Sequence, residues 1–185
     1  MSDIKQKLDK IRERLSDPSF LANKGLSNEV GIHVFCYDPA DEIIVREFIT
    51  HLIEEKNTPY HIRECDLYEI FLQLLEDKRV LKSVAALEEK RGSDYLLKQL
   101  QKIATPEALL EYMKYEPHEH GDVLVLTGIG KIYPFMRSHK MLDSMQHLFE
   151  DIPIVMFYPG SFNGQDLGLF GRFLDGHYYR AFNLL

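Results

Sequence analysis

The chain has 185 residues, of which 45% are hydrophobic and 28% charged, and a formal net charge of −7. These totals are ordinary for one globular domain with a sizeable core. The acidic balance argues against broad binding to nucleic acid or anionic lipid, since both require a basic face. No apolar run approaches the roughly 20 residues of a spanning helix, and the charged N-terminus is unlike a signal peptide. We therefore expect a cytoplasmic protein without membrane or direct nucleic-acid contacts.

The N-terminal segment is predicted to be an amphipathic helix over residues 2–16. Ile4, Leu8, Ile11 and Leu15 recur at helical spacing with charged residues between them, and Pro18 follows the pattern. We expect residues 1–20 to form an arm and residues 21–185 to form a single α/β domain. The apolar stripe must dock either on that domain or on a partner, and spacing alone does not decide between them.

Strands and helices then alternate along the chain. Residues 30–37 are dense in apolar and β-branched side chains, which predicts a buried strand. Asp38 and Pro39 follow as the N-cap and first residue of a helix. A second strand is expected over residues 60–65. Asp66 and Glu69 then have the spacing of a capping box before the helix "LYEIFLQLLED".

Residues 80–116 are polar and helical in pattern, which indicates a helical insertion between strands, broken near "RGSD" and restarted at Thr105-Pro106. Residues 122–129 have the continuous apolar character of a central strand. A helix beginning near Ser138 is expected to turn Met141, Leu142, Met145 and Leu148 inward. Residues 153–160 and 178–185 are predicted to be the fourth and fifth strands.

This alternation predicts an α/β fold with one doubly wound, mainly parallel sheet of about five strands and flanking helices. The layout is that of a P-loop NTPase without a working P-loop. Ligands of such sheets bind beyond the carboxyl ends of the strands. The turns at residues 37–39, 127–131 and 158–164 should therefore share one edge of the sheet.

The stretch "VLVLTGIGK" ends in Gly130-Lys131, as a phosphate-binding loop would. A P-loop requires a glycine five positions before its Gly-Lys pair and a Ser or Thr after it. Val125 and Ile132 occupy those two positions. Magnesium-dependent hydrolysis of nucleoside triphosphates is therefore not expected.

A weaker site for an anion or another ligand is compatible with this region, and its candidate residues are Asp38, Gly128, Gly130, Lys131, Arg137 and His139. The basic groups would gather near the start of a helix, where free amides favour negative charge. The alternative is a plain glycine turn with Lys131 solvated or paired to Asp38. The plain glycine turn is the favoured interpretation, because isolated Gly-x-Gly pairs are common in loops.

Other reactive groups form no recognisable constellation. His118 and His120 flank Glu119 but have no third metal ligand at a recognisable spacing, so no metal, no cofactor and no catalytic set is expected. Cys36 and Cys65 fall in separate strands, where buried thiols are expected.

The C-terminal region combines glycines with aromatic residues. Tyr158, Phe162, Phe170, Arg172 and Tyr178 are candidate anchors of a partner interface, since aromatic residues and arginine are enriched at interface hot spots. Packing of an edge strand explains the same residues equally well.

Four segments carry a resemblance to a known family: "VFCYDPADEIIVREF", "LYEIFLQLLE", "VLTGIGKIYPFMRSH" and "VMFYPGSFNGQDLGLFGRFLDGHYYRAFNL". From about Val30 onward, the chain resembles the BrxB proteins of bacterial BREX (bacteriophage exclusion) systems. The last two segments together are the specific ones.

The resemblance implies a small core component of a phage-defence system, encoded with the ATPase BrxC, the DNA adenine methyltransferase PglX and the alkaline-phosphatase-like protein PglZ. No catalytic activity is attached to the family. The expected function is that of a non-enzymatic adaptor in the defence complex, with PglZ as the first expected partner and BrxC and PglX as further candidates. The alternative is a regulatory protein that binds a ligand or nucleotide through a degenerate phosphate loop.

Overall fold

The computed structural model describes residues 3–23, 31–145, 148–164, 166–174 and 181–185. Its elements are, in chain order, α1 (Asp3–Leu15), α2 (Pro18–Leu21), β1 (Ile32–Tyr37), η1 (Pro39–Asp41), α3 (Glu42–Glu54), β2 (His61–Asp66), α4 (Leu67–Asp77), η2 (Leu81–Ser83), α5 (Val84–Arg91), α6 (Ser93–Ile103), α7 (Pro106–Met113), β3 (Asp122–Thr127), α8 (Ile129–Ile132), α9 (Ser138–Met145), β4 (Ile154–Phe162), β5 (Leu167–Leu169), β6 (Phe173–Leu174) and β7 (Phe182–Asn183).

The sheet has the strand order β2-β3-β4-β1-β7, and every pair along this path is parallel. β5 pairs antiparallel with the end of β4, and β6 pairs antiparallel with β5. The predicted α/β class with one mainly parallel sheet is therefore confirmed. The antiparallel extension was missed, because strands of two or three residues are too short to show a period of their own.

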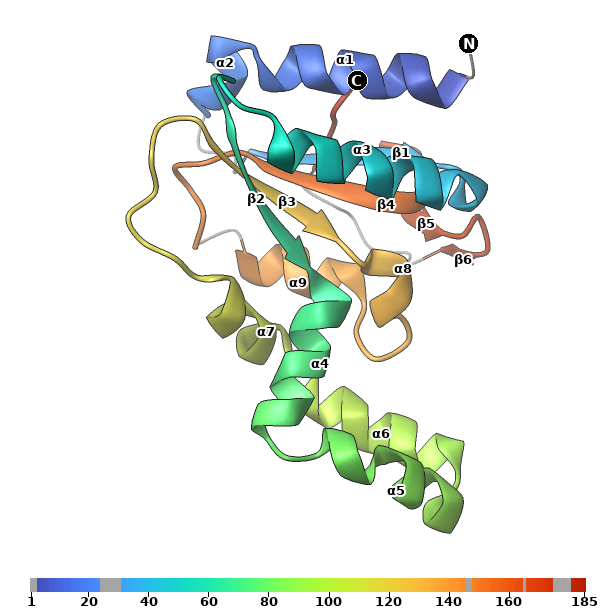
Figure 1. Ribbon diagram of the computed structural model, residues 1–185. Helices are drawn as coiled ribbons and strands as arrows, with labels where there is room; N and C mark the ends of the chain where they lie inside the picture. The colour runs from blue at the N-terminus through green and yellow to red at the C-terminus, as the bar shows by residue number, and fades with distance from the viewer. Residues whose placement is uncertain (1–2, 24–30, 146–147, 165, 175–180) are drawn as a thin grey trace.

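The two faces of the sheet are covered by different helices (Figure 1). The chain passes from β1 across β4 and β3 to β2 at the edge, and then returns through β3 to β4. Right-handed crossovers in opposite directions place their helices on opposite faces. Accordingly, α1 and α3 pack on one face, and α4 and α7 to α9 pack on the other.

β3 lies between the two cores, as its apolar run predicted. All six of its residues are buried. Val123 and Val125 join the core under α1 and α3, whereas Leu124 and Leu126 join the core under α4. Since side chains alternate across a strand, a strand that is covered on both faces needs apolar residues at consecutive positions.

The predicted N-terminal helix is α1, and its apolar stripe packs on the sheet. Ile4, Leu8, Ile11 and Leu15 are each at most 6% exposed and share a core with Val45 and Phe48 of α3. The stripe is thus buried within this chain.

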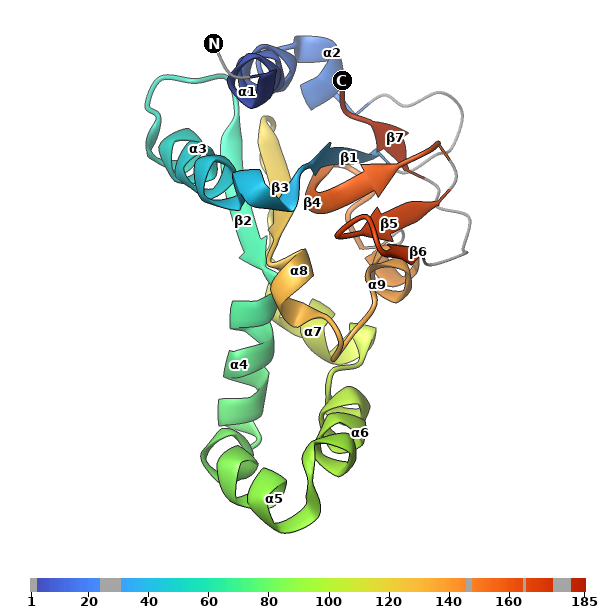
Figure 2. The ribbon, with the colours of Figure 1, turned by 90° about the vertical axis from the view of Figure 1, so that its right-hand side faces the viewer.

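The predicted helical insertion comprises η2, α5, α6 and α7. Gly92 separates α5 from α6 at φ 85°, and Thr105 caps α7 by accepting a hydrogen bond from the Ala108 amide. α5 and α6 lie at the far end of α4, away from the sheet (Figures 1 and 2). The part of the insertion that projects from the sheet is therefore α5 and α6, whereas α7 packs against the core.

Two expectations about the C-terminal half need correction. α9 ends at Met145, so Leu148 is 36% exposed instead of facing inward, and Phe149 is buried nearby. The fifth parallel strand is the short β7, and residues 178–180 of the segment expected there lie outside the described residues.

Candidate functional site

The carboxyl ends of β1 to β4 meet at one edge of the sheet, as predicted. Tyr37 of β1 lies opposite Pro159 of β4, and Asp66 of β2 lies opposite Thr127 of β3. The turn after β3 is therefore next to the start of α4.

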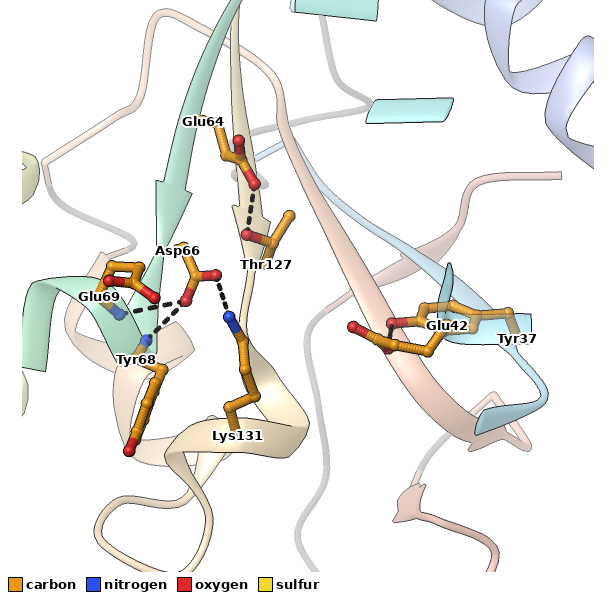
Figure 3. Close-up of polar contacts among 8 residues, drawn as sticks. All are labelled: Tyr37, Glu42, Glu64, Asp66, Tyr68, Glu69, Thr127 and Lys131. Carbon is orange, nitrogen blue, oxygen red and sulfur yellow. Dashed lines mark hydrogen bonds and ion pairs between the residues drawn. The ribbon is translucent and has the colours of Figure 1, made fainter. Parts of the chain in front are cut away.

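Lys131 of α8 forms an ion pair with Asp66 (Figure 3). Its Nζ lies 2.5 Å from Asp66 Oδ2. The other oxygen of Asp66 accepts hydrogen bonds from the amides of Tyr68, at 2.9 Å, and Glu69, at 3.2 Å. Asp66 thus caps α4, as predicted, and at the same time holds the ammonium group of Lys131. The pairing of Lys131 with Asp38 considered from the sequence is not what the structure shows.

The two glycines of the turn differ in what an added side chain would meet. Gly128 has φ 73°, and a Cβ there would lie 2.1 Å from Asp66 Oδ1. Gly130 lies inside α8 and is not in the positive φ region, but a Cβ there would lie 2.9 Å from the Phe170 ring. Gly128 permits the bend, and Gly130 makes room for a side chain from the C-terminal region.

Of the other described side chains proposed for an anion site, Asp38 and Arg137 do not line the pocket around Lys131. Asp38 is exposed and accepts a hydrogen bond from the Ala40 amide at 2.9 Å. Arg137 is exposed and lies beside Tyr133 and Phe173. The side chain of His139 lies outside the described part of the structure.

A polar pocket of about 220 Å³ does surround Lys131, between α3 and the ends of β2 and β3. Its lining consists of Glu42, Arg46, Thr50, Glu64, Asp66, Glu69, Thr127, Gly128 and Lys131. Four carboxylates face two basic groups, and Glu64 accepts the hydroxyl hydrogen bond of Thr127 at 2.7 Å. This excess of negative charge disfavours a phosphate or another anion.

Arg46 and Glu64 were not predicted from the sequence to belong to this pocket, and Asp66 was predicted only as the N-cap of α4. The three become neighbours of Lys131 because β2 pairs with β3 and α3 packs beside β2. The available signal was that Glu64 and Asp66 lie near the end of a strand, where side chains of a parallel sheet converge.

Burial disfavours the ionised form of Cys36, Cys65 and Tyr37. Burial raises the pKa of Cys36 to about 12 and that of Cys65 to about 11, so both thiols remain protonated. Burial, followed by the hydrogen bond to Glu42, also raises the pKa of Tyr37. Among the described residues no cluster of His, Cys, Asp and Glu is arranged to hold a metal ion.

The C-terminal candidates divide between the core and the surface. Tyr158 is 1% exposed and belongs to the core, and Phe162 is half-buried, whereas Phe170 is 38% exposed and Arg172 is exposed. Tyr178 lies outside the described residues. Phe173, which was not singled out from the sequence, is 45% exposed and lies against Tyr133, with 5.0 Å between ring centroids. We refer to Tyr133, Arg137, Phe170, Arg172 and Phe173 as the hairpin surface.

The fold and this edge define a class of protein: a doubly wound α/β domain in which the lysine of the turn after β3, Lys131, is paired with Asp66 of the same chain. The sequence model described as "BREX protein BrxB" matches residues 63–184. The chain belongs to the BrxB family, and it is thus a component of a BREX system, which implies a part in phage defence.

Two relatives support this assignment over the full length. A BREX protein BrxB of Bacillus cereus (strain H3081.97) is 40% identical, and the alignment covers 100% of this chain and 99% of the relative. A BREX protein BrxB of Escherichia coli O9:H4 (strain HS) is 28% identical over 98% of this chain and 92% of its own length. No solved structure matched significantly. None of the helices in the described ranges has both the length and the apolar character needed to cross a bilayer.

Proposed function

We propose that this chain is a non-enzymatic, cytoplasmic adaptor that joins other BREX proteins into the defence complex. The observation that carries the proposal is the hairpin surface, where exposed Phe170 and Phe173 flank exposed Arg172. Aromatic side chains beside an arginine are typical of interface hot spots.

The backbone at the tip of this surface is strained. Phe170 has φ 55° and Gly171 has φ 65°, and the Arg172 amide donates to the Leu169 carbonyl at 3.0 Å. Hairpin turns with two positive φ values normally begin with Asn, Asp or Gly. A phenylalanine there costs about 1 to 2 kcal/mol. Strain of this kind concentrates at functional positions and supports a role for the exposed ring.

PglZ is the partner that we propose first, followed by BrxC and PglX. The test is co-expression with tagged PglZ, followed by affinity capture and size exclusion. We expect co-elution that is lost in Arg172→Glu/Phe173→Ser. The matched control is Arg91→Glu/Tyr95→Ser on α5 and α6, where Arg91 lies over the exposed ring of Tyr95, 5.0 Å from its centroid. Separate elution of the unaltered chain from all three proteins would contradict the adaptor role.

The alternative function, regulation by a bound nucleotide, makes the opposite prediction for Lys131. Because Asp66 holds its ammonium group within an acidic pocket, we expect no binding heat with ATP, GTP or dinucleotides in calorimetry. Binding heat that Lys131→Ala abolishes would favour the alternative.

A further inference from the structure

β2 ends the sheet on one side, and its outer edge is unpaired among the described residues. The strand order begins with β2, and all six of its residues pair with β3 on the inner side. His61, Arg63 and Glu64 are exposed, whereas every residue of β3 is buried. Figure 2 shows β2 running directly into α4 at this side of the molecule.

The backbone of β2 offers hydrogen-bonding groups at this edge. The His61 amide donates to the Gly121 carbonyl at 2.8 Å, so His61 faces β3. Successive residues of a parallel strand direct their amide and carbonyl groups to alternate sides. Ile62 and Glu64 therefore direct theirs outward. Such an edge is a template for a further strand, and about six residues of partner chain would span it.

A groove of about 750 Å³ begins at residues 63–66, the second half of β2, and continues along α4. Its charged lining groups are Arg63, Glu64, Asp66, Glu69, Glu76 and Asp77. Figure 3 shows Glu64, Asp66 and Glu69 following one another from β2 into α4. Cys65 and Ile70 contribute apolar surface to the same groove. The lining of the groove thus includes five residues with carboxylates and one with a guanidinium group, beside an open strand edge.

Most of these carboxylates have no basic partner among the described residues. Asp66 is paired with Lys131, and Lys82 Nζ lies 3.7 Å from Glu76 as an exposed and therefore weak pair. Glu64 and Asp77 accept hydrogen bonds from the hydroxyls of Thr127 and Tyr112, and a hydroxyl donor brings no positive charge. Arg63 lies over the Tyr115 ring, 5.2 Å from its centroid.

We infer that this groove binds an extended segment of a partner protein with Lys or Arg at alternating positions, which adds a strand to β2. The backbone edge supplies affinity, and the carboxylates select basic side chains. A second copy of this chain is a poor occupant, since two acidic edges repel each other. The inference rests on the proposed adaptor role, to which it adds a surface separate from the hairpin surface.

The test uses the purified full chain and a blocked peptide of about seven residues in which Lys and Arg alternate with Val. We expect saturable binding by calorimetry, and slower amide exchange at Ile62 and Glu64 by NMR. A peptide with Glu in place of the basic residues should bind at least about tenfold more weakly. Two further peptides carry N-methyl groups on alternate amides, one on the odd-numbered and one on the even-numbered residues. One of them should not bind and the other should bind, because only one edge of the peptide strand faces β2.

Charge reversal in the groove is the corresponding test on the protein. Glu69→Arg/Glu76→Arg should weaken binding of the basic peptide at least about tenfold. The control is Glu47→Arg/Glu89→Arg, which alters two exposed glutamates outside the groove and should change the affinity for the peptide less than about twofold. Equal binding of both N-methylated peptides, no protection of Ile62 and Glu64, or self-association through β2 would each overturn the inference. If the peptide fails while PglZ still co-elutes, only this inference is lost, and the adaptor role stands.

Discussion

The Nζ atom of Lys131 and the Oδ2 atom of Asp66 lie 2.5 Å apart, although 65 residues separate them in the chain. The pair joins the turn after β3 to the first turn of α4. The carboxylate that holds the lysine also caps the helix, so the position from which a P-loop lysine would reach a phosphate is used to stabilise the fold.

The two roles of Asp66 can be separated by substitution. Asp66→Asn keeps an N-cap acceptor but removes the charge, whereas Asp66→Ala removes both. We expect Asp66→Ala to lower the free energy of unfolding by about 1 kcal/mol more than Asp66→Asn does. Urea unfolding of both variants, alone and combined with Lys131→Met, measures the cap and the ion pair separately. Equal losses in the two variants would show that the cap contributes nothing.

Gly128 should tolerate no side chain. Its φ of 73° and the 2.1 Å approach of a Cβ to Asp66 Oδ1 both oppose alanine. We expect Gly128→Ala to lower the free energy of unfolding by about 2 to 4 kcal/mol, through backbone strain and a disturbed cap. Gly171→Ala is the control, because Gly171 has φ 65° with open space around it, and strain alone costs about 1 kcal/mol. Thermal unfolding measures the stability of both variants. A similar loss of stability in Gly128→Ala and Gly171→Ala would show that the approach to Asp66 adds nothing to the backbone strain.

His33 should make stability depend on pH. Burial beside Phe20 of α2 and Phe182 of β7, with a smaller effect of Arg14, lowers the pKa of His33 from 6.5 to about 4. Between these values the unfolded state binds the proton and the folded state does not, so stability falls as pH drops below 6.5. The loss due to His33 between about pH 7.5 and about pH 5 is up to about 2 kcal/mol.

His33→Leu removes this titration and should reduce the difference in the free energy of unfolding between about pH 7.5 and about pH 5. The measurement is urea unfolding of both proteins at the two pH values, since the other histidines and the carboxylates are common to both. An unchanged dependence on pH in the variant would exclude His33 as its source.

The packing of α1 can be tested at Ile11, which is fully buried. Ile11→Ala should lower the free energy of unfolding by about 2 to 5 kcal/mol, because the cavity lies in the core shared with α3. Lys10→Ala on the exposed face should change it by less than about 0.5 kcal/mol. Chemical denaturation measures both, and a mild effect at Ile11 would mean that α1 adds little to that core.

The fold was largely predictable because its signals are local. The apolar run of β3, the stripe of α1 and the cap residues Asp66 and Thr105 each specify their element from neighbouring residues. The parallel arrangement then brings the turns after β1, β3 and β4 to one edge. β5 and β6 were missed because their pairing depends on β4, not on a pattern of their own.

The sequence by itself determined the fold class, the family and the failure of the P-loop pattern, since these depend on the order and spacing of residues. The tertiary structure alone decided which charges meet. Lys131 is paired with Asp66 and separated from Arg137, because β2 lies beside β3 while Arg137 lies with the hairpin surface. Electrostatic contacts depend on distances in space, and strand order fixes those distances between residues that no local pattern connects.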